Sequence, residues 1–86
     1  MSIIIYSKAN CPYCVRAKEL LTNKKVQYEE VRVDLDPVRL QEMQTRSQRR
    51  TVPQIFINDH YVGGFDDLYA LEQRGELDRL INVSST

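Results

Sequence analysis

The stretch "IIIYSKANCPYCVRAKELL", residues 3–21, joins a short apolar run to an amphipathic one through two closely spaced cysteines. Residues 3–6 are apolar and predict a buried strand. A helix is predicted from about Pro12 to Lys25, because proline suits the first helical turn and apolar residues then recur at helical spacing. The apolar face of that helix consists of Cys14, Ala17, Leu20 and Leu21. The cysteine pair therefore stands between a strand and a helix.

This position gives the two thiols different chemistry. Cys11 falls at the N-terminus of the predicted helix, where free N–H groups and the helix dipole favour a negative sulfur, and Lys8 adds positive potential nearby. In such motifs cysteine pKa values fall to ~3.5–7.5. Cys14 lies one turn later on the apolar face, so it should be less exposed and less ionised. The spacing allows a disulfide, and we predict that Cys11 attacks and Cys14 resolves.

The cysteine pair has three other interpretations. A structural zinc site needs four ligands, and the chain offers two cysteines and one histidine, His60, which is expected to face solvent in a hairpin. A purely structural disulfide would close a very short loop and stabilise little. An iron–sulfur cluster would need further ligands from a partner or a small thiol, and this alternative stays open.

The remaining elements follow from periodicity and turn signals. Residues 28–35 alternate as a strand does, with Val31, Val33 and Leu35 on one face. Asp36 and Pro37 predict the start of a second helix, which runs to about residue 46. Further elements are a strand at 53–57, a tight turn at 58–59, a strand at 60–62, a helix capped by Asp66 or Asp67 and ended by Gly75, a short turn at 76–81 and a loose tail at 82–86. The predicted order is β-α-β-α-β-β-α, with the first two strands parallel.

Composition limits the possible functions. The 86 residues suit a single domain, residues 1–86, and 12 basic residues balance 12 acidic ones, so no nucleic-acid partner is expected. No apolar run reaches the ~18 residues that span a membrane, and the N-terminus does not have the pattern of a signal peptide. We expect a cytoplasmic protein. The local basic cluster of Arg46, Arg49 and Arg50 is either a solvated loop or a steering patch for an anionic ligand.

Three motifs in this order, "CPYC" at 11–14, "TVPQIFI" at 51–57 and "GGFDDLYAL" at 63–71, give the chain a resemblance to the glutaredoxin family, dithiol CPYC type. The resemblance implies a thioredoxin-like α/β fold, in which a four-stranded mixed sheet is flanked by helices. It also implies a glutathione-dependent thiol–disulfide oxidoreductase that reduces protein–glutathione mixed disulfides and protein disulfides. Glutathione would be the co-substrate, the protein would be a monomer, and no metal is expected.

The resemblance also implies roles for individual residues. Cys11 would be the nucleophile and Cys14 the resolving thiol, and a cis peptide bond would precede Pro53. The implied glutathione-binding residues are Lys8, Tyr13, Thr51, Val52, Pro53, Gly64, Phe65, Asp66 and Asp67. A helix N-terminus offers N–H groups to a carboxylate, and extended pairing at Val52 would fix the register of the ligand. Phe65 is a departure, because close relatives often carry a third cysteine there.

Two competing functions share these features. A glutathione-ligated [2Fe–2S] carrier would use the same cysteine in a dimer. A thioredoxin-type reductant that ignores glutathione would share the fold and the cysteine pair. The "TVP" and "GGFDD" motifs favour the glutathione-dependent enzyme over the second of these.

Overall fold

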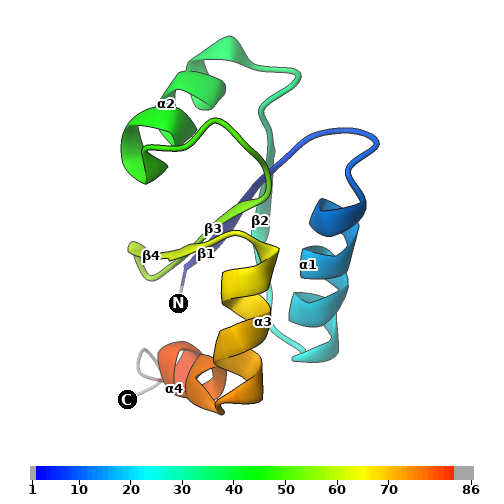
Figure 1. Ribbon diagram of the computed structural model, residues 1–86, viewed down its shortest axis with the longest axis vertical. Coiled ribbons are helices and arrows are strands. Elements are labelled where there is room, and N and C mark those ends of the chain that lie inside the picture. The colour runs from blue at the N-terminus through cyan, green and yellow to red at the C-terminus, as the bar shows by residue number, and fades with distance from the viewer. Residues whose placement is uncertain (1, 83–86) are drawn as a thin grey trace.

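The computed structural model describes residues 2–82 and contains one mixed sheet with helices on both faces (Figure 1). The elements in chain order are β1 (Ile3–Ser7), α1 (Pro12–Asn23), β2 (Glu29–Arg32), α2 (Pro37–Ser47), β3 (Gln54–Ile57), β4 (His60–Gly63), α3 (Phe65–Gln73) and α4 (Glu76–Asn82). The strand order is β2-β1-β3-β4. β1 is parallel to β2, and the other two pairs are antiparallel. The predicted thioredoxin-like architecture is confirmed.

The two faces of the sheet carry separate apolar clusters. Successive side chains of a strand point to opposite faces of the sheet, so β1 and β3 each contribute residues to both clusters. One cluster joins the sheet to α1, α3 and α4 through Ile3, Ile5, Ala17, Leu21, Ile55, Ile57, Leu68, Leu77 and Ile81. The other joins it to α2 through Tyr6, Val31, Val33, Met43 and Phe56. The sheet is thus held between two helical layers, and its central strands are covered on both sides.

The N-terminal residues of α2 confirm one predicted cap, and those of α3 correct another. The Asp36 side chain accepts hydrogen bonds from the N–H groups of Val38 and Arg39, at 3.1 and 3.4 Å. In α3 the N-cap is Gly64 rather than Asp66 or Asp67. The carboxylate of Asp67 reaches back and accepts from the Gly64 N–H at 3.1 Å. The helix therefore begins earlier than predicted, because an acidic side chain in its first turn satisfies the capping residue.

Other differences lie at the ends of elements. β2 stops at Arg32, shorter than the predicted 28–35, because the N–H of Leu35 turns back to the Arg32 carbonyl at 3.2 Å. Leu35 is consequently 72% exposed and not on the buried face with Val31 and Val33. α1 ends at Asn23, two residues before the predicted end. Gly75 follows the last residues of α3, as predicted, with a φ of 73°.

Two further predictions concern the surface and the tail. His60 is exposed on β4, as expected for a solvent-facing strand residue. Of the predicted loose tail, Asn82 ends α4 and residues 83–86 lie outside the described part of the chain.

Among the helices within residues 2–82, none has the length and apolar character needed to cross a membrane.

Candidate active site

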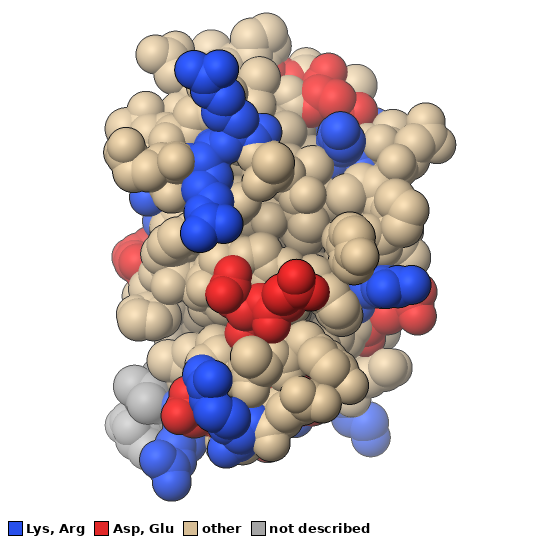
Figure 2. Space-filling model, viewed as in Figure 1, with Lys and Arg blue, Asp and Glu red and all other residues tan. Residues whose placement is uncertain are grey.

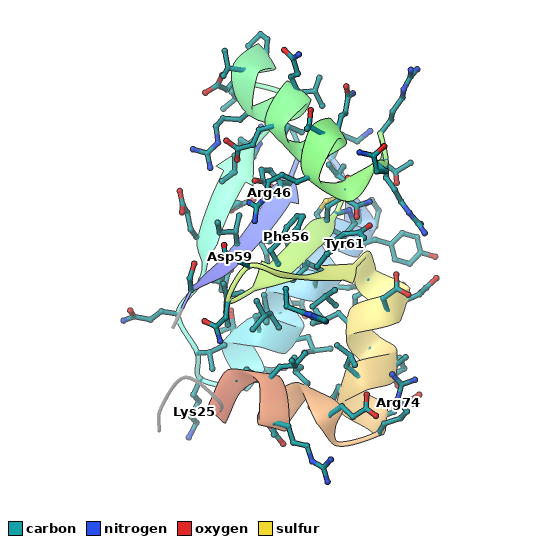
Figure 3. All side chains as sticks on the ribbon, turned by 90° about the vertical axis from the view of Figure 1, so that its left-hand side faces the viewer. Lys25, Arg46, Phe56, Asp59, Tyr61 and Arg74 are labelled. Carbon is teal, nitrogen blue, oxygen red and sulfur yellow. A yellow bond between two sulfur atoms is a disulfide. The ribbon has the colours of Figure 1, made fainter. Side chains whose placement is uncertain are left out.

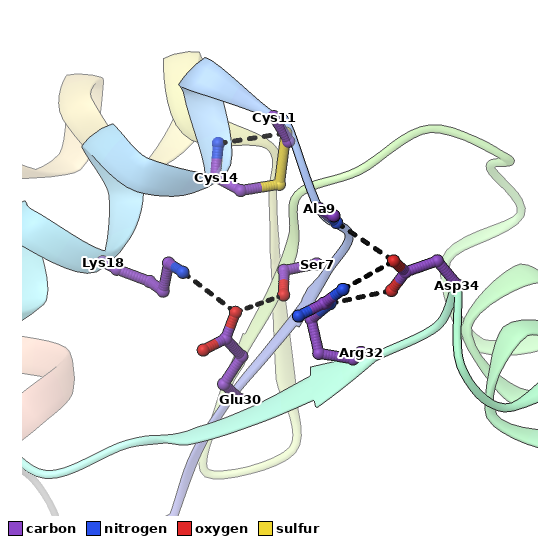
Figure 4. A network of polar contacts seen from close by, with 8 residues as sticks. All are labelled: Ser7, Ala9, Cys11, Cys14, Lys18, Glu30, Arg32 and Asp34. Carbon is purple, nitrogen blue, oxygen red and sulfur yellow. Dashed lines mark hydrogen bonds and ion pairs between the residues drawn. A yellow bond between two sulfur atoms is a disulfide. The ribbon is translucent and has the colours of Figure 1, made fainter.

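Cys11 and Cys14 form a disulfide at the start of α1, with their Cα atoms 5.2 Å apart (Figure 4). Cys11 is the N-cap residue of the helix, and its Sγ accepts a hydrogen bond from the Cys14 N–H at 3.2 Å. The exposed fraction is 8% for Cys11 and 1% for Cys14. A sulfur at this position receives the free N–H groups and the positive end of the helix dipole. Of the two sulfurs, that of Cys11 is the more accessible and the better placed to carry negative charge.

The loop before β3 brings a second element to this sulfur. The Sγ of Cys11 lies 4.0 Å from the carbonyl oxygen of Val52, and the Val52–Pro53 peptide bond is cis, as the resemblance implied. Pro53 stands directly before β3, so its missing N–H interrupts no sheet hydrogen bond. The backbone of Val52 therefore passes beside the redox pair at the edge of a groove.

This groove has a volume of about 230 Å³ and runs between the loop before β3 and the N-terminus of α3. Its lining residues are Tyr13, Arg49, Thr51, Val52, Pro53, Gln54, Gly64, Phe65, Asp66 and Asp67. In Figure 2 acidic side chains gather at the centre of this face, and basic side chains run toward them from the segment after α2. The structure thus brings eight of the nine residues proposed for glutathione binding into one groove and adds Arg49 and Gln54.

Two adjacent glycines with different constraints lead into α3, and the second of them lines the groove. Gly63 has a φ of 121°, and a Cβ at this position would come within 2.7 Å of the Asp67 Cγ. Gly63 is therefore required both by its backbone conformation and by the close approach of Asp67. Gly64 is less restricted, because a Cβ there would meet only the Pro53 carbonyl oxygen at 3.5 Å.

Lys8 is the one predicted binding residue that does not line the groove. It lines a neighbouring hollow of about 340 Å³, together with Val33, Asp34, Leu40, Arg50, Thr51 and Val52. The groove and this hollow share Thr51 and Val52. They are therefore adjacent, and both are lined by charges of both signs: Arg49, Asp66 and Asp67 in the groove, and Lys8, Asp34 and Arg50 in the hollow.

The three arginines that the sequence grouped together occupy different places. Arg49 lines the groove and Arg50 the hollow beside it. Arg46 belongs to α2, where its guanidinium lies 4.0 Å from the centroid of the Phe56 ring and donates to the Tyr6 hydroxyl at 2.9 Å (Figure 3). Arg46 is therefore a packing residue of the α2 face and not part of a solvated loop.

A third hollow, of about 510 Å³, opens on another side of Cys11 and includes Lys8, Cys11, Lys18, Glu30 and Arg32. Here the Ser7 hydroxyl donates to Glu30 at 2.5 Å, and the Lys18 ammonium lies 3.0 Å from the same oxygen (Figure 4). The hydrogen bond from Ser7 is the main cause that lowers the pKa of Glu30. This carboxylate is thus ionised and paired at neutral pH, and it gives the redox pair no spare proton donor.

A second ion pair lies farther along the same network. The side-chain hydrogen bonds from Arg32 hold the pKa of Asp34 far below its usual range. The Asp34 carboxylate also accepts from the Ala9 N–H at 3.2 Å, which ties the loop before Cys11 to the end of β2.

Within residues 2–82 no three histidine, cysteine or acidic side chains come together as a metal-binding group.

Comparisons with known proteins agree on one family. A family model described as Glutaredoxin matches residues 3–62. The chain is 51% identical over 80 residues to Glutaredoxin 3 of Escherichia coli K12, covering 93% of this chain and 96% of that protein. The solution structure of a glutaredoxin from Brucella melitensis superposes with a TM-score of 0.83 at 51% identity, covering 94% of this chain and 88% of that one. A buckwheat glutaredoxin–glutathione complex superposes with a TM-score of 0.86 at 25% identity, covering 93% and 76%.

Proposed function

The chain belongs to the glutaredoxin family of thiol–disulfide oxidoreductases, and on this premise we propose that it uses glutathione to reduce protein–glutathione mixed disulfides and protein disulfides. The observation that carries the proposal is the position of the Cys11 sulfur. It caps α1 and lies 4.0 Å from the Val52 carbonyl oxygen, at the edge of a groove with charged residues at its ends.

The two adjoining hollows suggest how glutathione lies. Its γ-glutamyl end carries an amine and a carboxylate, which suit the acidic residues Asp66 and Asp67 and the free N–H groups at the N-terminus of α3. Its glycine end carries a second carboxylate, which suits Lys8 and Arg50 in the neighbouring hollow, where the negative charge of Asp34 is already paired with Arg32. Thr51 and Val52 are common to both hollows, so the cysteinyl unit would pair with the Val52 backbone as an extended strand does.

With glutathione in this orientation, each remaining lining residue has a definite position around the ligand. Tyr13 and Phe65 form the side of the groove nearest α1 and α3, with ring centroids 6.0 Å apart. Pro53 and Gln54 form its base together with Gly64, and Arg49 adds a positive charge at its edge. With glutathione held at both ends, its sulfur is presented to Cys11.

For a glutathionylated protein, the Cys11 thiolate attacks the glutathione sulfur of the mixed disulfide. A new sulfur–sulfur bond forms to Cys11, and the protein thiolate leaves and takes up a proton. A second glutathione, as its thiolate, then attacks the glutathione sulfur bound to Cys11 and releases oxidised glutathione. Cys11 returns as a thiolate. The cycle consumes one free glutathione, whose sulfur is oxidised as the protein sulfur is reduced, and oxidised glutathione forms from it and the glutathionyl group of the substrate.

For a protein disulfide, Cys11 attacks one sulfur of the substrate and forms a protein mixed disulfide. Cys14 then loses its proton and attacks the Cys11 sulfur, which releases the substrate as a dithiol and leaves Cys11 joined to Cys14. The disulfide of the present structure corresponds to this oxidised form. Two glutathione molecules reduce it and are oxidised in turn.

Single substitutions of Cys11 and Cys14 test the different roles proposed for the two cysteines. In a coupled assay with glutathione and glutathione reductase, Cys11→Ser should lose all activity. Cys14→Ser should still turn over a glutathionylated peptide but should no longer reduce a protein disulfide. Loss of deglutathionylation in Cys14→Ser would contradict this scheme. Faster turnover with thioredoxin reductase than with glutathione would point instead to a thioredoxin-type reductant.

The iron–sulfur alternative gains no separate support from residues 2–82, and one observation tests it. A glutathione-ligated [2Fe–2S] carrier would be brown after anaerobic purification and would run as a dimer. We expect a colourless protein that runs as a monomer on gel filtration.

The proposed compartment is the cytoplasm. A dithiol that glutathione must keep reduced works where glutathione is itself kept reduced, which is the cytosol. Fractionation of cells that express the chain, followed by immunodetection, checks this assignment.

A further inference from the structure

A row of aromatic side chains borders the groove and crosses from α1 to α3. The ring centroids of Tyr13 and Phe65 are 6.0 Å apart, with their planes tilted by 32°. Those of Phe65 and Tyr69 are 5.7 Å apart, with their planes stacked at 20°. Beyond Tyr13, the Arg16 guanidinium lies 5.3 Å from the ring centroid. Phe65 is thus the middle ring of three.

Only part of this row touches the groove. Tyr13 and Phe65 are among its lining residues, whereas Tyr69 is not. Tyr13 is 53% exposed and Tyr69 is 46% exposed, so neither outer ring is fixed by burial in the core. Tyr69 follows Phe65 by four residues on α3, and side chains at this spacing lie next to each other on a helix. Tyr69 can therefore affect the groove through Phe65.

The position of Tyr13 matters for any ligand in the groove. A half-exposed aromatic side chain samples more than one rotamer, and fixing it when a ligand binds lowers the affinity. A neighbouring ring that holds it beforehand removes this loss. The contact with Arg16 is an exposed cation–π contact, which is a weak restraint. Phe65 is the other neighbour. One side of it packs against the core cluster that includes Leu68, and the stacked contact with Tyr69 restrains the ring on its more exposed side.

We propose that Tyr69 is a positioning residue for glutathione recognition, which acts by holding Phe65 and, through it, Tyr13 in the side wall of the groove. This inference rests on the proposed function, because it assumes that glutathione occupies the groove. It assigns a role to a side chain that lies outside the binding residues. It also explains why a phenylalanine at position 65 is compatible with an open groove: its ring is stacked on Tyr69 and does not swing across the opening.

The test compares Tyr69→Leu, which removes the ring, with Tyr69→Phe, which keeps it. Gln73→Leu is the matched control, because Gln73 is an exposed neighbour of Tyr69 on α3 but lies eight residues from Phe65, so a leucine there leaves the stacked pair of Phe65 and Tyr69 in place. With a glutathionylated peptide as substrate, Tyr69→Leu should raise KM about threefold to tenfold, the range expected when one aromatic pair is lost. The kcat should stay within about twofold of the wild type, because Cys11 is untouched. Tyr69→Phe and Gln73→Leu should keep the wild-type KM.

A spectroscopic measurement tests the same point without turnover. In NMR spectra of the oxidised protein, the ring resonances of Tyr13 should shift in Tyr69→Leu and stay in place in Gln73→Leu. An unchanged KM together with unshifted Tyr13 resonances in Tyr69→Leu would overturn the proposal, as would an equal rise of KM in Tyr69→Phe. If the wild type failed to turn over the glutathionylated peptide, the proposed function would fall, and the Tyr13 resonances would still decide whether Tyr69 positions that ring.

Discussion

Asp67 has two separate interactions at the groove: a hydrogen bond within the chain and a proposed ion pair with the amine of the ligand. Its carboxylate accepts from the Gly64 N–H at 3.1 Å, which an amide oxygen at the same position could also do. Its negative charge is the proposed partner of the ligand amine, which an amide could not replace. A substitution that keeps the shape and removes the charge therefore separates the two relations.

We predict that Asp67→Asn raises the KM for a glutathionylated peptide about threefold to tenfold, because an exposed charge pair contributes on the order of 1 kcal/mol. The free energy of unfolding should fall by no more than about 1 kcal/mol, which is the typical contribution of an acidic residue in the first turn of a helix. Steady-state kinetics and urea unfolding give the two values. Glu76→Gln, on α4 and away from the groove, is the charge-matched control, and an equal effect on KM there would refute the assignment.

At the scale of single residues, the sequence is most informative where local chemistry decides the outcome. The unequal burial of Cys11 and Cys14 follows from helical periodicity alone. Sequence reasoning misses Gln54 and leaves Arg49 between a solvated loop and a steering patch, because their place in the groove depends on the path of the chain into β3, for which no periodic signal exists. The position of Lys8 beside the groove depends on that same loop, since the hollow it lines is closed by Arg50 and Thr51.

The turn between β4 and α3 is the element with the tightest steric requirement. Gly63 combines a φ of 121° with a close approach to Asp67, whereas Gly75 has a φ of 73° and open space, with no heavy atom within 4 Å, where a Cβ would stand. We predict that Gly63→Ala lowers the free energy of unfolding by at least about 2 kcal/mol, because backbone strain of about 1–3 kcal/mol adds to the displacement of Asp67. Gly75→Ala should lower it by about 1 kcal/mol. Equal losses in urea unfolding would show that the contact with Asp67 does not matter.

The contact between β1, β2 and α1 beside the redox pair gives a prediction about pH. The pKa of Glu30 is lowered in the folded protein, chiefly by the Ser7 hydroxyl, below the ~4.3 of an unfolded glutamate. A lowered pKa stabilises the fold above pH ~4.3 and this contribution is lost as the pH falls through the folded value. The free energy of unfolding should therefore decrease below about pH 5.

Ser7→Ala tests this cause, because it removes the hydrogen bond and leaves the Lys18–Glu30 and Arg32–Asp34 pairs in place. We expect a shallower loss of stability between about pH 5 and pH 3 in the variant than in the wild type. Urea unfolding at a series of pH values measures both curves. Parallel curves would mean that Ser7 does not hold Glu30 in its ionised form.

Among the elements, the boundaries that carry a strong local signal are predicted best, namely the starts of α1 and α2 and the end of α3 at Gly75. Asp36 and Pro37 mark the start of α2 correctly because a side-chain cap and a proline act locally. The predicted cap of α3, Asp66 or Asp67, is wrong because acidic residues favour both the cap and the first turn, and only the bond between Asp67 and the Gly64 N–H separates these positions. Leu35 continues an alternating pattern in the sequence, but the turn after Arg32 removes it from the sheet.

At the scale of the whole molecule, the site depends on how the helices pack against the two faces of the sheet. Leu68 of α3 and Met43 of α2 are both fully buried, on opposite faces. We predict that Leu68→Ala and Met43→Ala each lower the free energy of unfolding by about 2–5 kcal/mol. Only Leu68→Ala should also raise the KM for a glutathionylated peptide, because α3 carries one wall of the groove. A comparable rise in Met43→Ala would mean that the groove responds to overall stability.

The sequence predicts the element order as far as α3 and the parallel direction of β1 and β2, but residues Glu76–Asn82 form the helix α4 where only a short turn is predicted. A short apolar strand followed by a helix and an alternating strand requires a right-handed crossover, which makes β1 and β2 parallel. Periodicity does not determine that β3 lies between β1 and β4, because Ile55 and Ile57 suit any strand covered on that face. That order comes from the structure.

The proposed mechanism depends most on the ionisation of Cys11, and one titration measures it. In reduced Cys14→Ser, Cys11 is the only thiol, so the pH dependence of its alkylation by iodoacetamide reports one group. The mechanism predicts a midpoint within the ~3.5–7.5 range of cysteines at helix N-termini, and so a mostly ionised sulfur at pH 7.5. A midpoint at or above ~8.5, the value of a free cysteine, would contradict it.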